Sequence, residues 1–185
     1  MRQSVELEAL AEAHLVAGRP ETAAELCEIH IHDGPPSIVI LRVLTAACER
    51  LGRMELAYEV ALKWASLAPF DAYAHYKLGM LEQGRGQFRE ALSRYSLVRN
   101  IAGEETDIGH AAEDAMQTLD LIQLLQISAL AEIDIAFRKG LMQDVREAVE
   151  ERGFMLSHRG LVTVAHAAAI MDQPRGKPLG GTYYQ

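Results

Sequence analysis

A 34-residue period recurs through the first half of this 185-residue chain. Three columns of identical residues follow it: Leu10, Leu44 and Leu78; Gly18, Gly52 and Gly86; and Ala23, Ala57 and Ala91. A fixed period of this size is typical of stacked structural units, each too small to bury its own apolar face. Such stacks usually bind other proteins, so the period indicates a class of function before any motif is considered.

Each period predicts two helices joined by a tight turn. Apolar residues recur at helical spacing on both sides of Gly52: Leu41, Leu44 and Cys48 before it, and Ala57, Val60, Ala61 and Trp64 after it. Pro35 and Pro69 end the first two helix pairs, and Ser37 and Asp71 are expected to cap the helices that follow. Because alanine and leucine dominate the apolar residues and aromatics make up only 6%, closely packed helices are favoured over sheets.

These columns resemble the tetratricopeptide repeat (TPR), in which Leu-Gly or Leu-Ala in the first helix is followed later by alanine, a bulky residue and proline. The resemblance covers three units, 4–37, 38–71 and 72–105, and is carried by Leu10-Ala11, Leu44-Thr45 and Leu78-Gly79. It departs from the family where the first helix normally has an aromatic residue, since this chain has His14, Cys48 and Glu82 there. The resemblance implies an all-α, TPR-like α-solenoid with a concave groove lined by the first helices.

Residues 106–172 keep helical character but lose the register of the repeat, and we expect them to cap the stack. Residues 106–137 are predicted as one long helix or two end-to-end pieces. Their stretch 119–135 is apolar nearly all round and is expected to be buried. Further helices are predicted at 141–151 and 155–171, and a degenerate fourth repeat at 126–155 remains an alternative. The long helix could also fill the groove itself. Residues 173–185 are rich in Pro and Gly and are predicted as a flexible tail or a short recognition peptide.

The TPR resemblance assigns a set of first-helix residues to the partner-binding groove. This set is Glu8, Glu12, Val39, Arg42, Val43, Ala46, Arg50, Tyr73, Tyr76, Lys77 and Met80. It combines an acidic end with an apolar middle, and tyrosine and methionine give large contact area at modest entropic cost. The alternative is that Tyr73 and Tyr76 only pack against the next repeat unit or the 106–137 helix. Glu8 and Glu12 would repel an acidic chain end, which argues against docking of a C-terminal carboxylate.

Composition narrows the remaining classes of function. The formal net charge of −8 disfavours nucleic acid as a partner. The most apolar stretch, 119–137, contains Asp120 and Glu132, so no membrane span is predicted. A signal peptide is not predicted. Two cysteines are too few for a disulfide framework, and we expect a cytoplasmic setting.

The sequence predicts neither an enzyme nor a cofactor. Cys27 and His30 lie three residues apart on one helical face, but both fall where the repeat places interior side chains, so packing is favoured over a metal site. Phosphate-binding glycine loops and nucleophile motifs are absent from the sequence.

We therefore expect a protein-interaction module, an adaptor, scaffold or assembly factor, that binds a partner helix or peptide in the groove. One alternative is a secretion-type chaperone that forms a homodimer and holds an apolar client segment. Another is a permanent structural subunit of a larger complex, in which the 106–137 helix contacts a neighbour.

Overall fold

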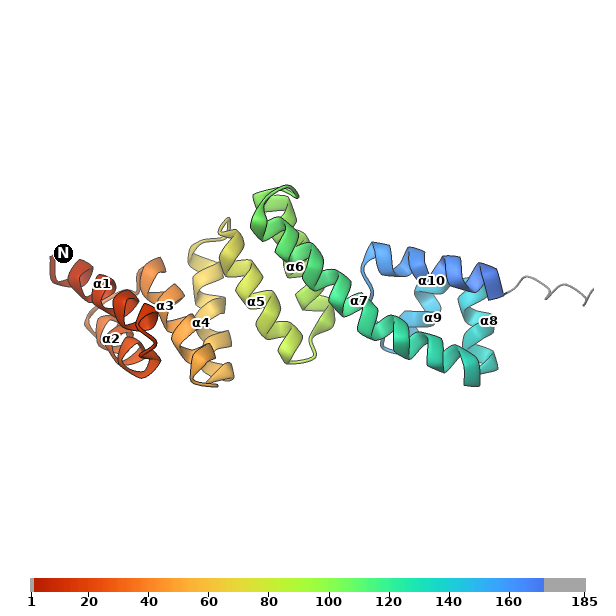
Figure 1. Cartoon of the computed structure of the whole chain (residues 1–185), viewed down its shortest axis with the longest axis horizontal. Helices are drawn as coiled ribbons and strands as arrows, with labels where there is room; N and C mark the ends of the chain where they lie inside the picture. The colour runs from red at the N-terminus through yellow and green to blue at the C-terminus, as the bar shows by residue number, and fades with distance from the viewer. Residues whose placement is uncertain (1, 172–185) are drawn as a thin grey trace, which may run out of the picture. The chain divides into compact units, whose positions relative to one another are not determined.

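The structure is a computed structural model that describes residues 2–171 of the chain, with side chains described for residues 5–170. The described residues form helices joined by short turns, without a strand (Figure 1). The helices are α1 (Arg2–Val16), α2 (Pro20–Asp33), α3 (Ile38–Arg50), α4 (Met54–Leu67), α5 (Ala72–Gly84), α6 (Phe88–Ala102), α7 (Asp107–Ile133), α8 (Ile135–Gln143), α9 (Val145–Glu151) and α10 (His158–Met171). The predicted all-α class is confirmed. The predicted tail, 173–185, lies outside the described residues.

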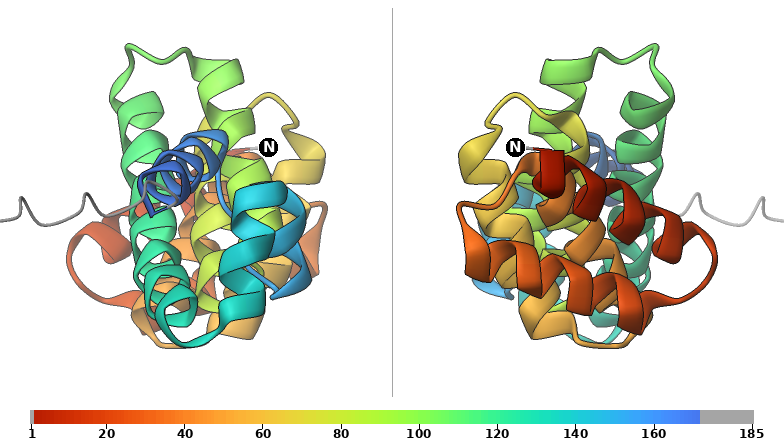
Figure 2. Two further views of the ribbon diagram at one scale, coloured as in Figure 1. Left: turned by 90° about the vertical axis from the view of Figure 1, so that its right-hand side faces the viewer. Right: turned by 90° about the vertical axis from the view of Figure 1, so that its left-hand side faces the viewer.

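The chain divides into two compact units, Met1–Met116 and Gln117–Gln185, and α7 contributes to both. In the first unit, α1 packs on α2, α3 on α4 and α5 on α6, as three successive antiparallel pairs. Figure 2 shows the first of these pairs, α1 and α2, nearest the viewer in its right-hand panel. The repeat bounds 4–37, 38–71 and 72–105 stay a prediction.

The turn inside each pair depends on a glycine with a positive φ. Gly18, Gly52 and Gly86 have φ values of 73°, 71° and 75°, in the left-handed region that other residues rarely adopt. The next step of the same period leads to Asp120, and α7 runs through this position without turning. The repeat therefore ends with the glycine column. Helix α7, in the place of the first helix of a fourth pair, continues as a longer helix.

Caps begin the first helices of the second and third pairs, as predicted. The Ser37 side chain accepts a hydrogen bond from the backbone N–H of Ile40 at 3.2 Å. The Asp71 carboxylate accepts one from the backbone N–H of Tyr73 at 3.0 Å. Asp71 also accepts a hydrogen bond from the indole N–H of Trp64, again at 3.0 Å, so it joins α4 to the start of α5.

The second unit differs from the prediction for residues 106–172. Residues 106–137, predicted as one long helix or two end-to-end pieces, are divided at Asp134, whose side chain caps α8 by accepting a hydrogen bond from the backbone N–H of Phe137 at 2.9 Å. The predicted 141–151 helix is divided in the same way at Asp144, which caps α9. Gly140 lies inside α8 and not in a turn, so a fourth repeat with its turn there is not formed.

Only one side of α7 is buried, so the expectation of a fully buried helix was wrong. Leu119 and Ile127 are buried, whereas Leu121 and Leu125 are 59% and 67% exposed. An apolar helix surface becomes core only where a neighbouring element packs on it, and in this unit the neighbours pack on one side.

Two polar residues of α7 organise the second unit. The side-chain amide of Gln123 exchanges two hydrogen bonds of 2.6 Å with the backbone of Met155. The buried carboxylate of Asp120 accepts hydrogen bonds from the backbone N–H of Ser157, at 2.8 Å, and from its hydroxyl. Ser157 in turn accepts a hydrogen bond from the backbone N–H of Gly160 at the start of α10. These polar residues therefore hold the connection between α9 and α10 against α7.

Replacing Asp120 by alanine is expected to lower the free energy of unfolding of the second unit by about 2 kcal/mol, since a buried backbone donor loses its acceptor. Urea denaturation and amide hydrogen exchange in α10 would measure the loss. Gln126→Ala, at an exposed position of the same helix, is the control and should change stability little. Unchanged exchange in α10 of the Asp120→Ala protein would show that this contact does not hold the helix.

Candidate protein-binding groove

The predicted groove residues lie on α1, α3 and α5, the first helices of the three pairs, and we call their shared side the first-helix face. Five of them are exposed: Glu12, Arg42, Arg50, Tyr73 and Met80. Five are half-buried: Glu8, Val39, Ala46, Tyr76 and Lys77. Val43 is only 2% exposed and belongs to the core, so it has little surface to offer a partner.

The cations of this face are engaged with the preceding helix pair. Arg42 on α3 forms an ion pair with Glu12 on α1, and Lys77 on α5 forms one with Glu49 on α3, each with an N–O distance of 2.7 Å. The Arg50 guanidinium donates a hydrogen bond to the backbone carbonyl of Leu15. These contacts link successive first helices, and a partner that used the same cations would have to compete with them.

The α5 part of the face is apolar and aromatic. Tyr73 is 59% exposed and Met80 is 43% exposed, two helical turns apart and therefore on one side of the helix. Between them, the Tyr76 ring lies 5.8 Å from the ring of buried Tyr95 on α6. Tyr76 thus packs against α6 inside its own pair, while Tyr73 and Met80 are exposed.

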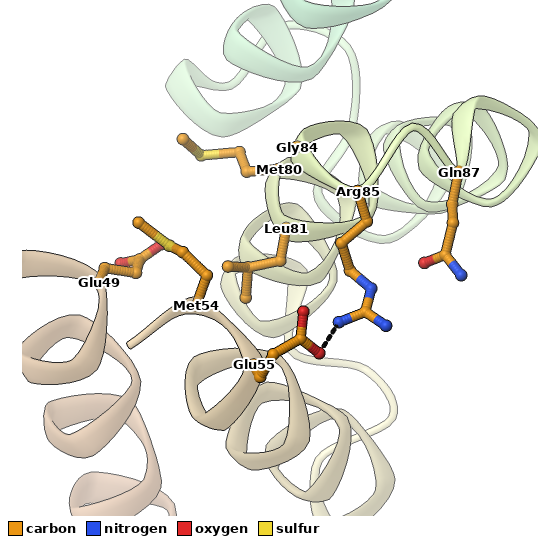
Figure 3. A pocket seen from close by; sticks show the side chains of 8 residues that line it. All are labelled: Glu49, Met54, Glu55, Met80, Leu81, Gly84, Arg85 and Gln87. Atoms are coloured by element: carbon orange, nitrogen blue, oxygen red, sulfur yellow. Dashed lines mark hydrogen bonds and ion pairs between the residues drawn. The ribbon is translucent and has the colours of Figure 1, made fainter. Parts of the chain in front are cut away.

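A pocket of about 630 Å³ opens at the end of this face, between the second and third pairs (Figure 3). It is lined by Glu49, Met54, Glu55, Met80, Leu81, Gly84, Arg85 and Gln87. The two methionines, of which Met54 is 50% exposed, supply flexible apolar surface that adapts to different side chains. Of these residues only Met80 was predicted from the sequence. Met54 begins α4 and Gln87 directly precedes α6. Both are second helices, where the repeat pattern places no partner contact.

Charges at this pocket are paired within the chain. The Arg85 guanidinium forms an ion pair with Glu55, as Figure 3 shows, and lies 4.3 Å from the ring centroid of Tyr58. Glu49 is neutralised by Lys77. The pocket therefore has an apolar floor with a charge-balanced rim, which suits an apolar side chain better than a charged ligand.

A buried polar cluster lies inside the third pair, where the repeat normally has an aromatic residue. Glu82, only 2% exposed, accepts a hydrogen bond from Arg94 on α6 at 3.3 Å, and its second carboxylate oxygen has no partner. Arg94 also lies 3.5 Å from the Nδ1 of His75, whose Nε2 is 2.9 Å from the Pro69 carbonyl. Burial raises the pKa of the Glu82 carboxyl above its usual range, and Arg94 offsets only part of this effect.

The raised pKa of Glu82 makes stability depend on pH in a defined direction. Because the folded state holds this proton more tightly than the unfolded state, Glu82 stabilises the fold at low pH, and this contribution is lost as pH rises through its folded pKa. Glu82→Gln removes the ionisation. We therefore expect its stability relative to the unmodified chain to rise with pH from about pH 4 and then level off. Urea denaturation across pH 4 to 8 would test this, and a constant difference would contradict it.

Among the described residues, no group of three or more His, Cys, Asp or Glu side chains could hold a metal ion. Cys27 and His30 are buried in the first unit. Burial raises the pKa of the Cys27 thiol to about 12, so this thiol stays protonated and unreactive near neutral pH. None of the helices in the described part of the chain is long and apolar enough to cross a membrane.

Together, the three hairpins and their glycine turns define a TPR-like helical fold. Two solved structures share it: one of MamA, with 16% identity, and one of MamA AMB-1, with 17%. The first covers 90% of this chain and 77% of MamA, the second 94% and 74%, each with a TM-score of 0.53. At this identity the likeness concerns the fold. No family model and no curated protein sequence matches the chain.

Proposed function

We propose that this chain is a protein-binding module without catalytic activity, which holds an apolar segment of a partner on the first-helix face. The observation that supports this most is the pocket of about 630 Å³ beside Met80, with Met54 and Leu81 forming its apolar wall. Tyr73 extends the apolar surface along α5. A partner helix or extended peptide would insert one large apolar side chain into the pocket and contact Tyr73 with a second.

The ion pairs of the first-helix face define what such a partner should carry. Because Arg42 and Lys77 are already paired with Glu12 and Glu49, a strongly acidic segment gains little from them. We therefore expect apolar content to decide affinity and charge to decide orientation. The buried, unpaired cysteines suit a reducing compartment such as the cytoplasm, where we place this binding.

The test compares two variants of the intact chain in pull-downs from native lysate. Tyr73→Ala combined with Met80→Asp changes the proposed site, and both side chains are exposed enough for the fold to persist. Ile29→Asp, at a 51% exposed position of α2, is the control for a new surface charge. We expect the site variant to recover a bound partner at least about tenfold less efficiently, since contact residues of this type contribute over 1 kcal/mol each.

Circular dichroism would verify that both variants remain helical. If both recovered the same partner equally well, the first-helix face would not be the binding site. A partner lost equally from the control variant would point to a general effect of surface charge and would also contradict the proposal.

The alternatives of a self-pairing chaperone or a structural subunit depend on an apolar surface outside the three pairs. The exposed apolar residues of α7 are such a surface. The role that we infer for this surface does not depend on the first-helix face.

A further inference from the structure

An apolar stripe runs along the exposed side of α7. Leu121, Ile122, Leu125 and Ile133 are exposed by 59%, 50%, 67% and 82%, and Ala129 is exposed between them. Leu121, Leu125, Ala129 and Ile133 follow one another at steps of four positions, and Ile122 lies three positions before Leu125, so all five fall on one side of the helix. We call these five residues the α7 stripe. All of them belong to the second unit.

The second unit completes its own core without the stripe. Ile127 and Ala131, on the opposite side of α7, are buried with Phe137, Leu141 and Val149. An apolar stripe that stays exposed when its domain is already packed marks a contact with another molecule. The identity of that molecule can be argued from the charge and the residue order of the stripe.

The α7 stripe carries no charge from Leu121 to Ala129, and the exposed Glu132 lies near its end. Between residues 117 and 131 the only ionisable side chain is Asp120, which is buried against Ser157. The chain as a whole has a net charge of −8, so two copies repel each other over most of their surface. In a two-fold interface the same patch is used by both copies. The uncharged patches of two copies can therefore contact each other without this repulsion.

The order of large and small residues in the stripe fits an antiparallel pair of α7 helices. When two copies cross antiparallel at Leu125, each residue faces the one equally far on the other side of Leu125. Leu121 then faces Ala129, and Ile122 faces Ser128. On either side of the central Leu125 contact, Leu121 and Ile122 thus meet small side chains, which suits ridges-into-grooves packing. A parallel pair would instead place Leu121 on Leu121 and Ala129 on Ala129, which leaves crowding at one end and a gap at the other.

We propose that two copies of this chain associate through the α7 stripe, as an antiparallel helix pair centred on Leu125. The stripe from Leu121 to Ile133 is roughly 18 Å long at about 1.5 Å per residue. Glu132, the exposed charge at its end, faces Thr118 of the other copy in this register and not a second Glu132. Stable interfaces bury about 800 Å² on each partner, which is more than one helix stripe supplies. The stripe therefore forms the apolar centre of the interface, and flanking residues form its rim.

The register can be tested with single cysteines in the full-length chain. Cys27 and Cys48 are buried, so an introduced exposed thiol would react first. Leu125→Cys is expected to give a disulfide-linked dimer under mild oxidation, because position 125 of each copy faces the same position of the other. Leu121→Cys alone should not cross-link, since the two thiols would lie roughly 12 Å apart along the axis. A mixture of Leu121→Cys and Ala129→Cys chains should give the mixed dimer. Leu62→Cys, at an exposed position of α4, is the control that reports random collision.

Sedimentation equilibrium tests the association itself. The unmodified chain should show twice the mass of a single chain, and Leu125→Glu should raise the dissociation constant at least 100-fold while circular dichroism stays unchanged. A monomeric unmodified chain at tens of micromolar would overturn the proposal, and so would a dimer that Leu125→Glu leaves intact. Cross-linking of Leu121→Cys with itself would replace the antiparallel register by a parallel one. A different protein bound at the stripe in place of a second copy would also overturn it.

Discussion

Replacing Trp64 by alanine is expected to lower the free energy of unfolding of the first unit by about 3–5 kcal/mol. Trp64 is 2% exposed on α4, and its indole N–H donates to the Asp71 carboxylate that caps α5. The substitution removes a large buried side chain and also releases the cap from the preceding helix pair. Urea denaturation followed by circular dichroism is the measurement, because the variant lacks the only tryptophan of the chain.

Trp64→Phe separates the two contributions of this side chain. Phenylalanine retains most of the apolar volume but cannot donate to Asp71, so we expect a loss much smaller than that of alanine, including about 1 kcal/mol for the hydrogen bond. If alanine and phenylalanine cost the same, the hydrogen bond and not the packing would dominate at this position. If neither had an effect, α4 would not support α5 in the described way.

Gly79→Ala is expected to lower the free energy of unfolding by about 2 kcal/mol, although alanine favours a helix. A Cβ atom at this position would lie 2.8 Å from Cε1 of the Tyr95 ring and 3.2 Å from the Cβ of Arg94. Tyr95 is fully buried and its hydroxyl donates to Gln83 at 2.8 Å, so its ring cannot easily move away. The two helices of the third pair would be forced apart.

The control for this prediction lies on the same helix. A Cβ at Gly84, the last residue of α5, meets no atom within 4 Å, so Gly84→Ala should be neutral or slightly stabilising. A double-mutant cycle with Tyr95→Ala adds a sharper criterion: Gly79→Ala should cost much less once the ring is removed. Additive effects of the two substitutions would show that the close approach at Gly79 is not the cause.

The small-residue columns of the sequence therefore have a definite physical meaning. Gly79 permits the close approach of α5 and α6, and the alanine column of the second helices, Ala23, Ala57 and Ala91, is fully buried. Helix pairs, turns and caps depend on short-range rules of spacing and hydrogen bonding, so the first unit could be predicted from the sequence. The site was predictable only in part, because Met80 and Tyr73 follow from the repeat register, whereas Met54 and Gln87 reach the pocket through the packing of two pairs.

What the sequence by itself determined is the helical hairpin and its repetition, because a glycine turn, a cap and a fixed period act within one segment of chain. What only the tertiary structure decided is which apolar residues are covered. Leu10 and Leu44 occupy the same column, yet Leu10 is 47% exposed and Leu44 is 3% exposed. Leu44 has a preceding helix pair to pack on, and Leu10 has none among the described residues. The same holds along α7, where Leu119 is buried and Leu121 is exposed, because burial depends on the neighbour and not on the residue.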